Sequence, residues 1–297
     1  MSSEPRVIAS KRRRSPGRWF ITTGWRHLIG IAILLFAGFP LLYILSASLN
    51  PGGTLVGSND LFRQVDFRNY VALFQSEQQP YGFWFMNSII IGVVTALGTV
   101  LLGALAAYAF SRMRFRGRRV GLLSLLLVQM FPQLLAVVAI YLLLYSIGEI
   151  FPILGLGSQL ALIMVYLGGA LGVNTFLMYG FFNTVPVSID EAAKIDGASH
   201  AQIFFGIILR LVTPVLAVIG LLSFVATIGE FVIASVVLQS PRSQTLAVGL
   251  YQFVSDETSK NWTFFAAGAV LAAIPVIALF LFLEKYIVGG LVSGAVK

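Results

Sequence analysis

Residues 85–110 read FMNSIIIGVVTALGTVLLGALAAYAF, a stretch that contains no charged side chain. The hydrocarbon core of a bilayer is about 30 Å thick, and about 20 helical residues are needed to cross it. The stretch is therefore long enough and apolar enough to cross a membrane as a single helix.

Five further stretches of the same kind surround it. Charged residues divide the chain into neutral segments at 27–59, 78–111, 120–148, 150–189, 211–229 and 261–283, and the fifth continues to about 238 past one acid. Their apolar runs do not alternate with polar residues, as outer-membrane strands would. We therefore expect an all-α integral membrane protein with six transmembrane helices, near 27–49, 85–110, 120–145, 157–182, 211–238 and 264–288.

The composition supports a membrane protein and excludes several other classes. Of 297 residues, 58% are hydrophobic and 11% are charged, whereas a soluble domain has about 25% charged residues. The chain has no cysteine and only two histidines, which excludes thiolate sites and makes a histidine metal centre implausible. It lacks a phosphate-binding loop of the G-x-x-x-x-G-K-[ST] type and a catalytic constellation. We expect no enzyme activity, no metal and no bound cofactor.

Lysine and arginine are distributed unevenly between the two sides of the expected helices. The N-terminal tail carries seven, the second loop five, the fourth loop two and the C-terminal end two, whereas the opposing loops carry two, none and two. Basic loops stay on the cytoplasmic side, so both ends are expected in the cytoplasm. The net charge of +8 thus indicates orientation, with no nucleic-acid partner. The loop arginines expected to set orientation and meet headgroups are Arg112, Arg114, Arg116, Arg118 and Arg119.

This pattern divides the chain into three parts. Residues 1–26 form a basic cytoplasmic tail, residues 27–289 form the six-span domain, and residues 290–297 form a short cytoplasmic tail. The first boundary follows Arg26, the last charged residue before the first neutral stretch.

The fourth loop, residues 184–210, is expected to fold as a helical hairpin. Ser188 and Glu191 have the spacing of a capping box, in which each side chain pairs with a free backbone N–H at a helix start. Ser199 and Gln202 repeat that spacing. A glycine at 197, between the two, suits the left-handed conformation that ends a helix.

The tip of this hairpin can lie on lipid headgroups or dock on a cytoplasmic protein. Its three acids are a poor charge pattern for an anionic membrane surface. Its small residues leave room for a protein groove to close around it. We expect protein docking, through Asp190, Glu191, Ala192, Ala193, Asp196 and Gly197.

The same loop resembles that of the permease subunits of binding-protein-dependent ABC importers. The resemblance rests on Glu-Ala-Ala at 191–193, Gly197 and Ile-Ile-Leu at 207–209. It implies that the loop forms coupling helices, which sit in a cleft of the ATPase subunit and transmit its closure to the membrane helices. The chain departs from the family at Arg210, where a proline is usual.

Further similarity, to MalG-type permeases of maltose and maltodextrin importers, extends over nearly the whole chain. It implies a prokaryotic cytoplasmic membrane and a disaccharide or oligosaccharide substrate, maltose-like or trehalose-like. It also implies a homologous second permease, two ATPase subunits that hold ATP and Mg, and an extracytoplasmic sugar-binding protein. The matching stretches are 107–115, 129–132, 166–169, 245–249 and 289–297.

Glu230 is the one acid within an expected transmembrane helix. Charge inside a membrane is costly, so such a residue usually faces a cavity or a partner. Ser223, Thr227, Glu230 and Ala234 follow at spacings of four, three and four, which places them on one helix face. This face is expected either to line the translocation pathway as a gate or to make an interhelical hydrogen bond. The alternative function is an ion-coupled secondary transporter or channel that uses Glu230.

Three amide side chains also lie in or near expected helices. Gln129, Asn87 and Asn174 are expected to hydrogen-bond neighbouring helices, with a place in the pathway as the other possibility for each.

The last outer loop, residues 239–263, is expected either to be a solvated connector or to meet the binding protein. The second interpretation rests on the stretch shared with the family, which is Thr245, Leu246, Ala247, Val248 and Gly249.

Overall fold

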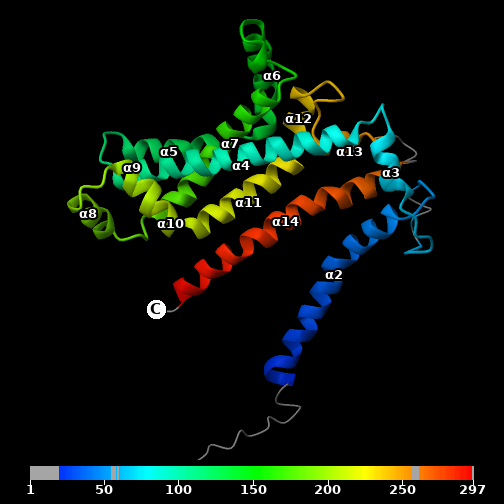
Figure 1. The fold of residues 1–297 in the computed structure, drawn as a ribbon, viewed down its shortest axis with the longest axis horizontal. Coiled ribbons are helices and arrows are strands. Elements are labelled where there is room, and N and C mark those ends of the chain that lie inside the picture. Colours follow the sequence, from blue (N-terminus) through cyan, green and yellow to red (C-terminus); the bar gives the residue numbers. More distant parts are fainter. Residues whose placement is uncertain (1–19, 55–57, 59, 256–260, 296–297) are drawn as a thin grey trace, which may run out of the picture.

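A computed structural model describes residues 20–54, 58, 60–255 and 261–295, and all regular secondary structure within these ranges is helical (Figure 1). The predicted all-α class is confirmed. Four helices are long and apolar enough to cross a bilayer over most or all of their length. These are α2 (Trp25–Ser48), α4 (Tyr81–Arg112), α7 (Gln159–Phe182) and α14 (Trp262–Ala295).

The third expected helix is broken into two. The chain bends by 101° between helix α5 (Arg118–Gln129) and helix α6 (Gln133–Ile150), and α6 projects away from α4 and α5 in Figure 1. Pro132 lies in the break and has no backbone N–H to donate, and its ring disfavours helical geometry in the residue before it. The prediction of one continuous helix over 120–145 is therefore wrong.

The fifth expected helix is also broken. Helix α11 (Thr213–Gly229) ends before Glu230, whose ψ of 122° is extended, and helix α12 (Val232–Val237) follows. The Glu230 carboxylate accepts hydrogen bonds from the backbone N–H groups of Ile233 and Ala234 at 2.8 and 2.9 Å. It therefore caps α12, and the prediction of an unbroken helix over 211–238 is wrong.

Another bend lies where the chain enters α11. The helical segment His200–Leu211 meets Thr213–Gly229 at 79°. The described residues thus contain four candidate spans that are each one helical segment, and up to six spans when each bent pair is counted as one.

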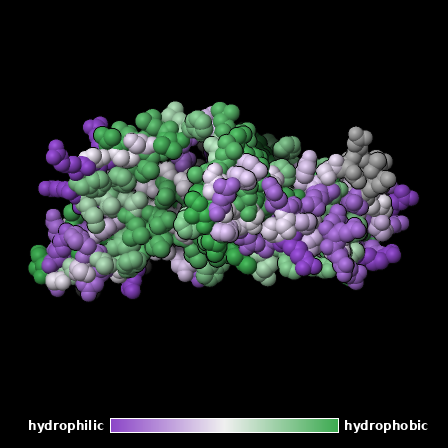
Figure 2. Space-filling model, turned by 90° about the horizontal axis from the view of Figure 1, so that it is seen from above, coloured by the Kyte–Doolittle hydropathy of each residue, from purple (hydrophilic) through white to green (hydrophobic). Residues whose placement is uncertain are grey.

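Helix α4 lies at the centre of the arrangement. It packs against α7 and α11, and α14 packs against α11 and α2. At one end of α4, the short helices α3 (Arg68–Gln75) and α13 (Leu246–Tyr251) pack on it. Figure 2 shows hydrophobic side chains over the middle of the molecule and hydrophilic ones at both ends, the distribution expected of a protein that lies across a bilayer.

The remaining short elements lie in the connections. A π-helical turn, η1 (Phe20–Gly24), precedes α2, and a 3-10 turn, η3 (Pro152–Leu154), follows α6.

Candidate functional site

The segment between α7 and α11 folds as a helix, a turn and a second helical stretch. Helix α8 spans Val187–Ile195, and the turn contains Gly197 with a φ of +82°, the left-handed conformation that favours glycine. The second stretch consists of α9 (His200–Gln202), the π-helix η4 (Ile203–Ile208) and α10 (Leu209–Leu211).

Of the two predicted capping boxes, only the second is present. The Ser199 hydroxyl accepts from the Gln202 backbone N–H at 3.3 Å, and the Gln202 side chain accepts from the Ser199 N–H at 2.8 Å. Helix α8 instead begins after Pro186, with no side-chain cap. Because the proline ring fixes its φ in a range suited to helix entry, the helix starts before Ser188 and leaves that residue inside the first turn. The first box was a wrong prediction.

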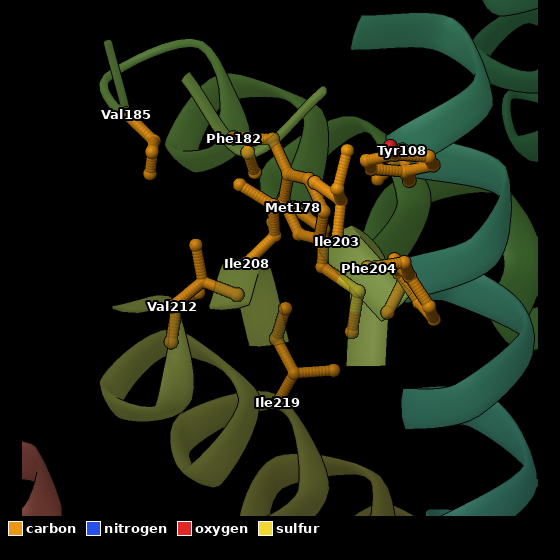
Figure 3. Packing of buried hydrophobic residues seen from close by; sticks show 13 residues of the cluster. Tyr108, Met178, Phe182, Val185, Ile203, Phe204, Ile208, Val212 and Ile219 are labelled. Atoms are coloured by element: carbon orange, nitrogen blue, oxygen red, sulfur yellow. The ribbon is translucent and has the colours of Figure 1, made fainter. Parts of the chain in front are cut away.

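One side of the hairpin belongs to a core shared with three long helices. Ala193 from α8 and three side chains of η4 are buried there. Figure 3 shows the side chains of η4 directed at Tyr108 of α4 and at Met178 and Phe182 of α7. The labelled members of this core are Tyr108, Met178, Phe182, Val185, Ile203, Phe204, Ile208, Val212 and Ile219.

The other side of the hairpin is exposed. Glu191, Ala192, Asp196 and Gly197 are solvent-exposed, and Ile195 between them is 86% exposed. The sequence analysis did not single out Ile195, although its position along α8 indicates that it is exposed. Residues 189 and 193 lie one helical turn apart and face the core, and residue 195 falls off that line.

Asp190 lies on the buried side. It is 2% exposed, and its carboxylate forms an ion pair of 3.0 Å with the guanidinium of Arg112 at the end of α4. Arg112 also donates to the Val185 carbonyl at 2.8 Å. Arg112 is therefore an internal partner of the hairpin, and the prediction that it meets headgroups is wrong. A direct contact of Asp190 with a docked protein is also excluded by this burial.

Two hydrogen bonds join polar side chains of different helical segments, and a third lies within α11. The hydroxyl of Tyr166 on α7 donates to Glu230 at 2.5 Å, and the Ser223 hydroxyl donates to Thr99 on α4 at 3.3 Å. Thr227 donates to the Ser223 carbonyl at 2.8 Å and is buried. Because α11 ends at residue 229, Glu230 does not share a helix face with the other two.

The three amides have different partners. Gln129 donates to the Gly169 carbonyl on α7, as expected for a contact between helices. Asn174 donates to the Ala170 carbonyl of its own helix at 2.9 Å. Asn87 donates to the carbonyls of Arg242 and Gln244 at 2.9 Å each, so it fastens the outer loop to α4.

The shared stretch of the outer loop lies mostly in the interior. Thr245, Leu246, Val248 and Gly249 are buried, and only Ala247 is partly exposed. A Cβ atom at Gly249 would overlap the indole ring of Trp84. These side chains seat α13 against α4, and the prediction that they meet a binding protein finds no support in their position.

Comparison with known proteins places the chain in a family. Residues 99–291, more than half of the chain, match the family described as "Binding-protein-dependent transport system inner membrane component". The chain belongs to this family. No cluster of three or more metal-binding side chains is found among its described residues.

Relatives of known function are similar over almost the full length. The galactooligosaccharides transport system permease protein GanQ of Bacillus subtilis is 39% identical, with 94% of this chain and 97% of the relative covered. The maltose/maltodextrin transport system permease protein MalG of Escherichia coli is 37% identical, with 94% and 96% covered.

Solved structures show the same fold. A bacterial ABC transporter involved in the import of the acidic polysaccharide alginate matches with a TM-score of 0.75 at 25% identity, over 92% of this chain and 99% of that chain. A bacterial alginate ABC transporter in complex with its pentasaccharide-bound periplasmic protein matches with a TM-score of 0.63 at 17% identity, over 91% and 94%.

Proposed function

We propose that this chain is the membrane-spanning subunit of an ATP-driven importer for a disaccharide or oligosaccharide. The proposal is supported by its family and by relatives whose names specify galactooligosaccharides, maltose and maltodextrin. A maltose-like or trehalose-like sugar fits this range of relatives. The subunit provides passage through the prokaryotic cytoplasmic membrane, with both ends in the cytoplasm, and hydrolyses no nucleotide itself.

The partners follow from this role. A homologous second permease completes the pathway, an extracytoplasmic protein delivers the sugar, and two ATPase subunits bind ATP and Mg. Large apolar surfaces on this chain agree with a membrane-embedded partner and with lipid, since side chains along α6 such as Leu134, Leu142 and Ile150 are more than half exposed.

The observation that carries the proposal is the two-sided hairpin. Its inner side, including Ala193 and Ile203, is part of the core formed by α4, α7 and α11. Its outer side presents Glu191, Ala192 and Ile195. A protein that binds the outer side and then moves must displace the inner side, because closely packed cores transmit displacement with little compression. ATPase closure would thereby reach the membrane helices.

The ion-coupled alternative has less support. The Glu230 carboxylate accepts three hydrogen bonds, from the Tyr166 hydroxyl and from the N–H groups of Ile233 and Ala234. These bonds give the carboxylate a structural role between α7 and α12. A bound ion is not needed to explain why an acid lies at this position. We therefore assign Glu230 to the support of the pathway wall.

Co-purification tests the proposal. The tagged chain is extracted from its native membrane in mild detergent, as wild type, as Glu191→Lys and as Glu149→Lys. Glu149 is an exposed acid on α6, so it controls for the charge change alone. We expect the ATPase and a second permease with the wild type and with Glu149→Lys, and loss of the ATPase with Glu191→Lys. A chain that purifies alone in every case would contradict the proposal.

A further inference from the structure

One charged contact joins the hairpin to a membrane helix. The Arg112 Nε lies 3.0 Å from an Asp190 carboxylate oxygen, and the two side chains are 6% and 3% exposed. The other ion pairs among the described residues, Arg63 with Asp60 and Arg68 with Asp66, lie in the segment before α3 and at its first residue, where both arginines are exposed. Arg112–Asp190 is therefore the only pair in the described part of the chain that links two separate elements in the interior.

Additional hydrogen bonds concentrate at the same place. The Arg112 guanidinium donates to the Val185 carbonyl at 2.8 Å, and the neighbouring Ser111 hydroxyl donates to the Asn183 side chain at 2.8 Å. The last turn of α4 thus holds the connection between α7 and α8 at residues 183 and 185, and α8 itself at residue 190. The Asp190 oxygens have no hydrogen-bond partner among the described residues, so this carboxylate depends on Arg112 for its charge compensation.

Stability alone is a weak reason for such a pair. Removing two charges from water costs about as much as their attraction returns, and apolar residues of similar volume often stabilise a core equally well. What the pair adds is a fixed position of α8 relative to α4. If one partner moved away, the other would remain buried as an uncompensated charge. A fixed position matters where the two elements must move together.

We propose that Arg112 and Asp190 are positioning residues that make α8 and the cytoplasmic end of α4 move as one body. This inference rests on the proposed docking of the hairpin to an ATPase. Because α4 packs against both α7 and α11, displacement of α4 reaches the other core helices directly. The push on the exposed side of α8 is then transmitted along a helix through a buried charge pair, in addition to the apolar core.

The first test measures coupling. The complex is reconstituted in proteoliposomes with its binding protein and sugar, and sugar transported per ATP hydrolysed is compared between wild type, Asp190→Asn and Arg114→Gln. Arg114 lies two residues after Arg112, beyond the end of α4, and is exposed, so it controls for the loss of a nearby charge. We expect the ratio to fall by about tenfold in Asp190→Asn, the scale of a lost coupling interaction, and to stay unchanged in Arg114→Gln. An unchanged ratio in Asp190→Asn would overturn the inference.

A second variant covers failure of the first to fold. Arg112→Met with Asp190→Leu leaves no unpaired buried charge, and it is expected to assemble and to show the same loss of coupling. Arg112→Lys keeps the positive charge. It is expected to give a ratio of sugar transported per ATP hydrolysed between those of the wild type and the apolar double variant. Normal coupling in the apolar double variant would show that packing alone positions the hairpin, and the inference would be wrong.

The second test measures the motion directly. The chain has no cysteine, so spin labels can be placed at Ser188→Cys on α8 and Leu105→Cys on α4, both exposed positions. In the wild-type complex we expect one narrow label distance that is the same without nucleotide and with trapped ATP. In Asp190→Asn we expect the distance to differ between the two states. A wild-type distance that changes on ATP trapping would overturn the inference.

Failure of the inference and failure of the proposed function give different results. If Glu191→Lys loses the ATPase while Asp190→Asn couples normally, docking stands and the ion pair has no part in transmission. If Glu191→Lys keeps the ATPase and full transport, the docking itself is wrong, and the inference falls with it.

Discussion

The hydroxyl of Tyr166 in the first half of α7 donates a hydrogen bond of 2.5 Å to the carboxylate of Glu230, at the break between α11 and α12. The same carboxylate caps α12 through the backbone N–H groups of Ile233 and Ala234. One acid thus ends one helix, begins the next and ties both to a third. This explains how a charged residue can lie within an otherwise apolar stretch.

Two substitutions separate these contributions. Tyr166→Phe removes one hydrogen bond between helices, and we expect it to lower the free energy of unfolding by about 1 kcal/mol or less. Glu230→Ala removes the same hydrogen bond and also leaves the backbone N–H groups at the start of α12 without a cap. We expect it to lower the free energy of unfolding by about 2 kcal/mol. Thermal unfolding of the purified complex measures both. Equal effects of the two substitutions would contradict the capping role.

If Glu230 has a structural role, sugar uptake needs ATP and no ion gradient. Sugar uptake by proteoliposomes that contain ATP is expected to continue when an ionophore collapses the proton and sodium gradients. Glu230→Gln is expected to be equally insensitive to the ionophore. The amide has nearly the same shape as the carboxylate but does not bind and release a proton. Uptake that stops with the gradient would support the ion-coupled alternative.

Gly197 provides a prediction on backbone conformation. Its φ is +82°, and a Cβ atom there would meet no atom within 4 Å. A substitution is therefore strained by the backbone alone, by about 1–2 kcal/mol. Gly197→Val is expected to abolish transport with the protein still inserted, and Gly197→Asn to retain more activity because asparagine tolerates this conformation.

The matched control for this series is Gly206. It also has open space around it, and its φ is not in the positive range. Gly206→Ala is expected to leave transport close to the wild-type rate. Transport by Gly197→Val at the rate of Gly206→Ala would contradict the need for a left-handed turn.

Gly249 provides a prediction on packing. A Cβ atom there would overlap the ring of Trp84, whereas one at Gly180 would meet nothing within 4 Å. The indole is held by its hydrogen bond to the Pro241 carbonyl at 2.7 Å. Gly249→Ala is therefore expected to destabilise the protein by about 1–3 kcal/mol, the usual cost of overpacking, and Gly180→Ala by much less. Thermal unfolding of the two variants measures this difference. Equal shifts of the unfolding temperature would contradict the close packing of Gly249 against Trp84.

The sequence predicted the placement of the long helices well and their breaks poorly. Hydropathy averages over about 20 residues, so it located α4 and α7 within a few residues of 85–110 and 157–182, and it located the start of α14 but not its end, which lies at Ala295. A break depends on single residues. Pro132 was a visible signal that the average concealed, whereas the break at Glu230 involves a partner on another helix.

The candidate site divides in the same way. The turn glycine and the second capping box follow from local chemistry, and both were predictable. The burial of Asp190 depends on Arg112, which is distant in the sequence, and no local pattern distinguishes that arginine from its neighbours in the basic loop. Exposure of Ile195 likewise depends on which side of α8 the core occupies.

If the exposed side of the hairpin meets an ATPase, site-specific cross-linking at Ile195 captures that contact directly. A photoreactive amino acid is placed at position 195, and at Glu149 as a control, and native membranes are irradiated. We predict a protein adduct that contains the ATPase from position 195 and none from position 149. Adducts of position 195 with lipid alone would contradict the claim, because the hairpin would then lie on the membrane surface.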